Sequence, residues 1–376
     1  VNSEKYPFKL RHTLFHQANK YRFIEAAAES YYASPYVSNF DTYSYKFSKN
    51  LSNTISLVFD KKTFKLDAGF RHQLINLGTD RVLPTAVGVV IPTENKENRL
   101  GAVGNLEIKL WDKVDVKSFL EYSNGKSFGN YLRSENLLKL EPIKGYVLDA
   151  HVNFQSAIPS FNYLMNPSFY QNFNYNFGGA KNQSITEIGG KVNLKWFESS
   201  VFANYFRIDN FAYFGTDFLP KQSSETVNIS QIGGEATLNY WKLKFNTKLL
   251  FQSALSQKEL LPMPNFVGRL NVFYQSKAFK NAAEIQTGFK VYYFSKFKSR
   301  DYFPVLNEFV LSNSGTSIGG QPIADAYFNM KVKRMMIFAE AQHFNTTFMK
   351  NKSFTAPNYP IYDFRLNLGI VWYIFH

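Results

Sequence analysis

Apolar and polar residues alternate along much of the chain with a period of two, which is the period of a β-strand with one apolar and one polar face. Phe64, Leu66 and Phe70 lie on one face of such a segment, and Lys65 and Arg71 lie on the other. The same alternation runs through 242–252, 283–294 and 363–374. This pattern predicts a sheet that is apolar on one side and polar on the other.

Sixteen segments carry enough of this pattern to be predicted as strands. They are 5–14, 51–60, 63–75, 99–111, 113–122, 131–140, 145–156, 184–196, 199–208, 227–240, 242–254, 266–276, 282–295, 321–333, 335–345 and 362–375. Alternation is weakest in 131–140 and 199–208, so fourteen strands is the alternative count. Sequence missing before residue 1 would add more strands.

The connections between these segments alternate between short charged turns and long stretches rich in Asn, Ser, Gly, Pro and Tyr. The long ones cover roughly 15–50, 76–98, 123–130, 157–183, 209–226, 255–265, 297–320 and 346–361. Short turns on one rim and long loops on the other are typical of a transmembrane β-barrel. We therefore predict an all-β fold, a transmembrane antiparallel up-and-down β-barrel of about 16 strands, as a single domain over 1–376, with the absence of an N-terminal portion left open.

Composition agrees with this fold and excludes several others. Aromatic residues make up 18% of the chain, and no window approaches the 18 apolar residues that a spanning helix needs. Cysteine is absent, which excludes disulfides and thiolate metal sites. The formal net charge is +14, but the basic residues are spread singly rather than in runs, so nucleic acid is not an expected partner.

Aromatic residues recur where predicted strands meet the short turns, where an interfacial girdle anchors a barrel at the level of the lipid headgroups. They are Phe59, Trp111, Trp196, Phe197, Tyr240, Trp241, Tyr274, Trp372 and Phe375. The alternative interpretation is the core of a soluble sheet. Their placement at nearly every short turn favours the girdle.

The C-terminal third resembles the putative porin family of Bacteroidota outer membranes. The resemblance rests on the blocks 301–310, 318–334, 355–360 and 364–375, with looser similarity at 6–12 and 261–266. It implies an outer-membrane barrel that serves as a pore, without catalytic residues. Members of that family usually carry additional sequence before the region that begins here.

If the apolar faces meet lipid, the polar faces line the lumen, where basic residues are in excess. The predicted pore-lining residues are Arg11, Lys65, Arg71, Lys117, Lys244, Lys248, Arg269, Lys290, Lys331 and Arg365. Rings of Lys and Arg favour anions in a pore. The alternative is that these charges pair with carboxylates of neighbouring strands as a structural lattice, so that only the surplus biases transport.

Catalytic chemistry has little support in the sequence. His151 alone among the histidines is predicted to face the lumen, beside Asp149 on the same strand. A polar lumen accounts for such residues, so we predict no enzyme, no catalytic or cofactor-binding residues, no metal site and no cofactor. A lipid or peptide hydrolase is the least favoured function.

Two hypotheses from different classes follow from these observations. The first is a porin-like barrel that allows small hydrophilic solutes to diffuse, with a preference for anions. The second is a plugged accessory barrel that contacts partner proteins in an outer-membrane complex. Either would lie in the outer membrane of a Gram-negative bacterium as a multi-pass β-barrel, in contact with lipid and lipopolysaccharide, after assembly by the insertion machinery.

Overall fold

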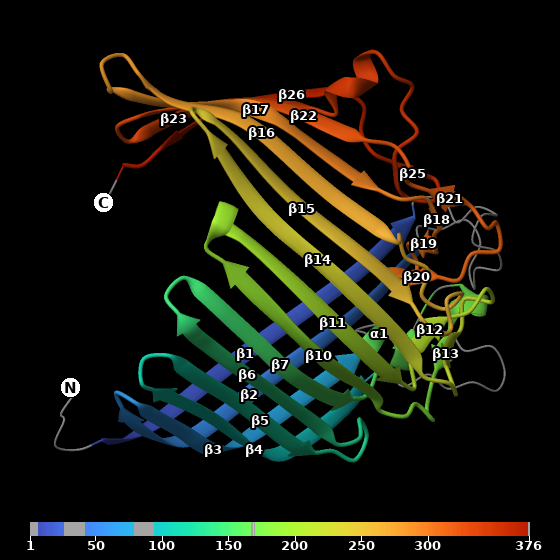
Figure 1. Cartoon of the computed structure of the whole chain (residues 1–376). Coiled ribbons are helices and arrows are strands. Elements are labelled where there is room, and N and C mark those ends of the chain that lie inside the picture. Colours follow the sequence, from blue (N-terminus) through green and yellow to red (C-terminus); the bar gives the residue numbers. More distant parts are fainter. Residues whose placement is uncertain (1–6, 26–41, 79–93, 167, 169, 375–376) are drawn as a thin grey trace.

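The computed structural model describes residues 7–25, 42–78, 94–166, 168 and 170–374, and it consists of one large antiparallel sheet with loop elements at one end (Figure 1). The sixteen strands, in their order across the sheet, are β1 (Phe8–Glu25), β2 (Thr42–Lys61), β3 (Phe64–Gly78), β4 (Glu94–Leu110), β5 (Val114–Asn124), β6 (Tyr131–Ile143), β7 (Tyr146–Ala157), β10 (Gln183–Leu194), β11 (Ser199–Asp209), β14 (Val227–Tyr240), β15 (Leu243–Ala254), β16 (Phe266–Ala278), β17 (Ala283–Phe294), β22 (Ile323–Val332), β23 (Met335–Gln342) and β26 (Arg365–Trp372). Each strand pairs with the next along the chain, as in an up-and-down meander. Within the described residues, no helix is both long and apolar enough to cross a membrane.

The predicted count of sixteen strands is confirmed, and the two weakest segments are both strands, β6 and β11. The N-terminal boundaries are corrected. The first strand continues to Glu25 instead of ending at residue 14, and the second begins at Thr42 instead of residue 51. The predicted first long connection, 15–50, is thus strand at both ends, and its middle lies outside the described residues.

The apolar face of the sheet is its outer face. Phe70 is 81% exposed, and Leu100, on the neighbouring strand, is 69% exposed. On the opposite face, Val103 and Glu121 are buried. Because apolar side chains cover the convex surface of a strongly curved sheet, this surface suits contact with lipid rather than with water.

The two outermost strands of the sheet are β1 and β26, and they do not pair with each other. The prediction of a closed barrel is therefore met only in part, since the sheet curves as a barrel wall but has two free edges. Figure 1 shows these edges diverging toward the side where both chain ends lie. Closure was predicted because lipid cannot satisfy unpaired backbone groups. In this structure, the outward backbone groups of β1 and β26 have no neighbouring strand to pair with.

Elements of the long loops gather at the other end of the sheet, beside α1 (Phe161–Leu164) (Figure 1). Two loops build a four-stranded sheet from β12 (Ala212–Phe214), β13 (Pro220–Gln222), β19 (Asp301–Phe303) and β20 (Glu308–Val310). Three two-stranded pairs accompany it: β8 (Met165–Asn166) with β9 (Tyr175–Asn176), β18 (Phe297–Lys298) with β21 (Ser317–Ile318), and β24 (Phe354–Ala356) with β25 (Tyr359–Pro360). Segments 158–182, 210–226 and 295–322, which follow β7, β11 and β17, are called the cap below.

Candidate functional site

The strand register places all ten predicted pore-lining residues on one face, the concave one. Each pairing step carries this face to the next strand, for example from Lys65 to Glu107 and from Glu107 to Lys117. The ten are Arg11, Lys65, Arg71, Lys117, Lys244, Lys248, Arg269, Lys290, Lys331 and Arg365, on strands β1, β3, β5, β15, β16, β17, β22 and β26. Their role in lining a pore stays a prediction.

Half of these ten basic residues form ion pairs with carboxylates of the same face. The pairs are Arg11–Asp67 at 2.6 Å, Lys65–Asp60 at 3.5 Å, Arg71–Glu121 at 2.5 Å, Lys248–Glu235 at 4.0 Å and Lys290–Glu340 at 3.5 Å. Three of the pairs reach across an intervening strand, as side chains on a concave surface can. The lattice interpretation therefore holds for part of the set.

Glycine makes room for one of these long contacts. Gly101 lies between Arg71 and Ser123 in the register, on the strand that the Arg71–Glu121 pair crosses. A Cβ at Gly101 would overlap with the carbonyl oxygen of Tyr122. The backbones thus come closer than any other residue would allow.

The other half of the set has no carboxylate within ion-pair distance in the part of the chain that the structure describes. Lys117 and Lys331 at least face Glu107 and Glu284 in the register. Lys244, Arg269 and Arg365 face uncharged or basic residues instead. The basic surplus of the wall is therefore concentrated on β15, β16 and β26.

Two like charges stand directly opposite each other on β15 and β16. Lys248 of β15 pairs in register with Arg269 of β16. Arg269 donates to the Asn246 side chain at 2.7 Å, while its buried Nε has no hydrogen-bond partner among the described residues. Directly opposed like charges destabilise a sheet, so an anion between them would relieve their repulsion. We call Lys244, Lys248 and Arg269 the basic strip.

A cavity of about 530 Å³ lies on the same face, over β4 to β10. His151 contacts Glu187 there at 3.3 Å, and Gly189 leaves space for its ring. The sequence predicted Asp149 as the neighbour of His151, but Glu187, on the adjacent strand, is the partner. Ser118 also lines this cavity, and its hydroxyl donates to Asn136 at 2.7 Å rather than to His151.

The cap extends across the long-loop end of the concave face. Its β12 and β20 pair through Phe214 and Val310, although they follow strands that are four places apart in the sheet. On the far side, Tyr21 of β1 donates to the carbonyl oxygen of Pro304, and Lys46 of β2 donates to that of Leu306 at 3.0 Å. The cap thus connects β1 and β2 with the loops that follow β11 and β17.

A core of buried aromatic and aliphatic side chains holds the cap together. Its members are Tyr170, Phe173, Tyr175, Phe214, Phe303, Val305, Leu306 and Val310. Tyr163 of α1 stacks on Phe214 with ring centroids 4.6 Å apart. A loop region with its own hydrophobic core is an ordered element rather than a set of independent loops.

Polar groups are buried beside this core. Asn162 donates to the Glu308 carboxylate at 2.6 Å, and burial raises the pKa of Glu308 above its ordinary value. Burial also raises the pKa of Tyr163 to about 12 and lowers the pKa of Arg300. Sequence reasoning missed this cluster because its members come from segments predicted only as loops, and no motif links them.

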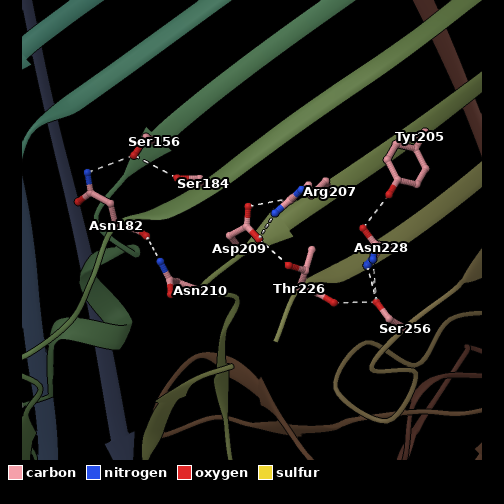
Figure 2. Close-up of polar contacts among 10 residues, drawn as sticks. All are labelled: Ser156, Asn182, Ser184, Tyr205, Arg207, Asp209, Asn210, Thr226, Asn228 and Ser256. Atoms are coloured by element: carbon pink, nitrogen blue, oxygen red, sulfur yellow. Dashed lines mark hydrogen bonds and ion pairs between the residues drawn. The ribbon is translucent and has the colours of Figure 1, made fainter. Parts of the chain in front are cut away.

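The outer face becomes polar where the strands approach the cap (Figure 2). Arg207 donates to Asp209 at 3.1 Å, and Thr226 donates to the same carboxylate at 2.6 Å. Tyr205 donates to Asn228 at 2.8 Å, and Asn228 in turn donates to Ser256 at 3.2 Å. These hydrogen-bonded polar side chains mark the border of the apolar outer face on the side of the cap.

Comparisons with known proteins identify the family of the chain and agree with its fold. A family model described as "Putative porin" matches residues 2–376, which confirms the predicted family, while the Bacteroidota origin stays a prediction. No curated protein matches the chain. Among solved structures, the ferric enterobactin receptor PfeA of Pseudomonas aeruginosa is similar with a TM-score of 0.69 and 12% identity, over 96% of this chain and 59% of that one.

Two further structures show the same fold. The siderophore receptor PirA from Acinetobacter baumannii gives a TM-score of 0.66 and 10% identity, over 96% of this chain and 59% of that one. The FrpB iron transporter from Neisseria meningitidis gives 0.63 and 13%, over 96% and 61%. The chain therefore spans about three fifths of the length of these structures.

Proposed function

Because the chain belongs to the putative porin family, we propose that it conducts small hydrophilic solutes along its concave wall, with a preference for anions. The family and the similar receptors and transporters establish an outer-membrane β-barrel protein. The similar structures include a ferric enterobactin receptor, an iron transporter and the copper transporter OprC, and these names support transport as the class of function. The solute and the conduction itself are the proposal.

The basic strip is the observation that carries the anion preference. Lys248 and Arg269 oppose each other, and Glu235 at 4.0 Å from Lys248 already pairs with Lys191 at 3.4 Å. Glu235 thus serves two lysines, and Arg269 has no carboxylate within ion-pair distance among the described residues, so the local potential is positive. A positive wall raises the local concentration of anions and lowers that of cations.

Planar-bilayer recording tests this directly. Under a potassium chloride gradient, the reversal potential of the folded protein is expected to indicate anion preference. Lys248→Gln with Arg269→Gln should shift it toward cations, while Lys350→Gln with Lys352→Gln, which changes two loop cations, should not. Absence of channels, or an unchanged reversal potential in the first variant, contradicts the proposal.

The cap is proposed to restrict this path. It bridges the mouth of the concave face and is held to β1 and β2 through Tyr21 and Lys46. Replacing residues 301–310 by a short Gly-Ser linker should raise single-channel conductance severalfold. Equal conductance with and without the segment would mean that solutes pass elsewhere or that the lumen stays filled.

An accessory role is the second candidate, favoured by apolar side chains exposed on the long-loop side. Phe309, Phe348 and Tyr362 are 45%, 69% and 74% exposed. Exposed aromatic side chains of this kind mark contact surfaces for proteins. Stoichiometric co-purification of another protein from native membranes, lost in a Phe309→Ser and Phe348→Ser variant, would support this role. No enzymatic activity is proposed.

A further inference from the structure

The short-turn rim carries a concentration of positive charge without ion-pair partners. Seven short turns connect the paired strands on this side, at 62–63, 111–113, 144–145, 195–198, 241–242, 279–282 and 333–334. Every one contains at least one basic residue: Lys62, Lys113, Lys144, Lys195, Lys242, Lys280, Lys333 and Arg334. The only acidic residues in these turns are Asp112 and Glu198. None of the eight cations forms an ion pair in the described part of the chain.

The opposite rim differs in its balance of basic and acidic residues. There, the outward charge of Arg207 is neutralised by Asp209, which Thr226 also binds (Figure 2). Lys221 pairs with Asp217 at 2.9 Å, also on the long-loop side. Among the described residues, lysines without ion-pair partners also lie on the long-loop side, but acidic residues are interspersed among them. The short turns hold eight cations and only two acidic residues, so the excess of positive charge is a property of the short-turn side.

All four tryptophans of the chain accompany these cations. Trp111, Trp196, Trp241 and Trp372 lie at the short-turn ends of the strands and are 82%, 64%, 79% and 70% exposed. Indole rings in such positions settle at the level of the lipid headgroups. Lys242 lies over the Trp241 ring, with its Nζ 5.2 Å from the centroid, so ring and cation occupy the same level.

The backbone conformation of the turns does not favour aromatic residues at these positions. Trp111, Phe197, Trp241 and Phe279 adopt positive φ angles of 51°, 55°, 54° and 51°. Bulky residues rarely adopt this region, and tight hairpin turns favour Asn or Gly in it. The large side chains therefore carry a conformational cost that contact with the membrane interface can offset.

We propose that the short-turn rim binds anionic phospholipid headgroups, with the turn lysines pairing with headgroup phosphates and the rings fixing their depth. In outer-membrane barrels the short turns face the periplasm. The bound lipids would thus be phospholipids of the periplasmic leaflet, such as phosphatidylglycerol. The ring of turns would select these lipids from the zwitterionic ones around them.

Tryptophan fluorescence reads this rim alone, since all four tryptophans of the sequence lie on it. In phosphatidylcholine vesicles, we expect brominated phosphatidylglycerol to quench the tryptophan fluorescence more strongly than brominated phosphatidylcholine. The difference should correspond to about fivefold tighter binding, because each lysine near an anionic surface contributes a factor of about that size. High salt should abolish the difference, because the screening length falls to about 3 Å at 1 M. Equal quenching by the two lipids at low salt would overturn the proposal.

A pair of matched variants locates the effect. Lys62, Lys113, Lys144, Lys195 and Lys280, all changed to Gln, should bring the quenching ratio close to one. The same change at Lys126, Lys181, Lys258, Lys350 and Lys352, which lie on the long-loop side, should leave it unchanged. Equal loss in both would show attraction to net charge rather than a rim site and would overturn the proposal. Should the rim variant not fold, the salt series on the unaltered protein decides.

Discussion

At the scale of single residues, two opposing free-energy contributions act on the aromatic residues of the short turns. A positive φ angle destabilises the turn, and burial of the ring at the membrane interface stabilises it. Trp111→Asn should relieve a left-handed turn by about 1–2 kcal/mol. It should also remove an indole whose burial at the interface is worth about 3 kcal/mol. We therefore expect the free energy of unfolding in vesicles to fall by about 1–2 kcal/mol. Urea titration in vesicles measures it.

A change in the same turn provides the control for this balance. Asp112 has a φ of 52° and no aromatic ring, so Asp112→Gly relieves strain without losing interfacial contact. Its unfolding free energy should rise by about 0.5–1 kcal/mol. If Trp111→Asn stabilises the protein as Asp112→Gly does, the ring has no anchoring role.

Glu308 predicts a pH dependence of the cap with a definite sign. Because burial raises its pKa, the native cap binds this proton more tightly than the unfolded segment does. The associated stability is complete below the ordinary carboxyl pKa and is lost as the pH rises through the raised value. Glu308→Gln should remove this dependence while keeping an acceptor for Asn162.

Because the sequence contains no cysteine, the pH dependence of cap opening can be measured with a single introduced thiol. Val305 is fully buried in the cap, so Val305→Cys gives a unique thiol whose alkylation requires the cap to open. The alkylation rate of this variant, divided by the rate of the double variant that also carries Glu308→Gln, should increase with pH above the ordinary carboxyl pKa. Division at each pH cancels the titration of the thiol itself. A flat ratio would remove Glu308 as the cause.

At the scale of elements, the cap depends on the contact between its two halves. Phe214→Ala removes a fully buried ring at the junction of β12 and β20, at a cost of about 3–5 kcal/mol. In the Val305→Cys background, this change should accelerate alkylation of the introduced thiol by at least about a hundredfold, while the circular dichroism of the large sheet is unchanged. Phe309→Ala, at an exposed position of the same small sheet, should have a far smaller effect.

The elements also show how far sequence could predict this fold. All sixteen strands were predictable, because period-two alternation is visible wherever one face is apolar. The second half of β1 was missed because its outward positions include His16, Lys20 and Arg22, which break the apolar pattern. The pairing of β12 with β20 joins residues nearly a hundred positions apart without any local signal. Basic residues on the wall followed from the alternation, but the opposition of Lys248 and Arg269 required the register.

At the scale of the whole molecule, the sheet has two free edges, formed by β1 and β26. Tyr21 and Lys46 hold the cap near β1 and β2, whereas the short-turn ends of β1 and β26 lie apart in Figure 1. On each edge strand, the backbone N–H and C=O groups of every second residue point away from the sheet and lack a strand partner, which is costly in lipid. The structure therefore predicts that β1 and β26 do not pair with each other in a bilayer.

Cysteine cross-linking decides whether this gap persists in a bilayer. Leu10→Cys with Leu57→Cys joins positions that are directly opposite in register and should form a disulfide readily. Leu10→Cys with Ile370→Cys joins the two edges near the short turns and should not. Shifted partners at Leu368 and Trp372 cover other registers of a closed sheet. Efficient linkage in any edge pair would mean that β1 and β26 meet in the membrane. Its absence, with the control pair linked, would leave both edges free to take a further strand.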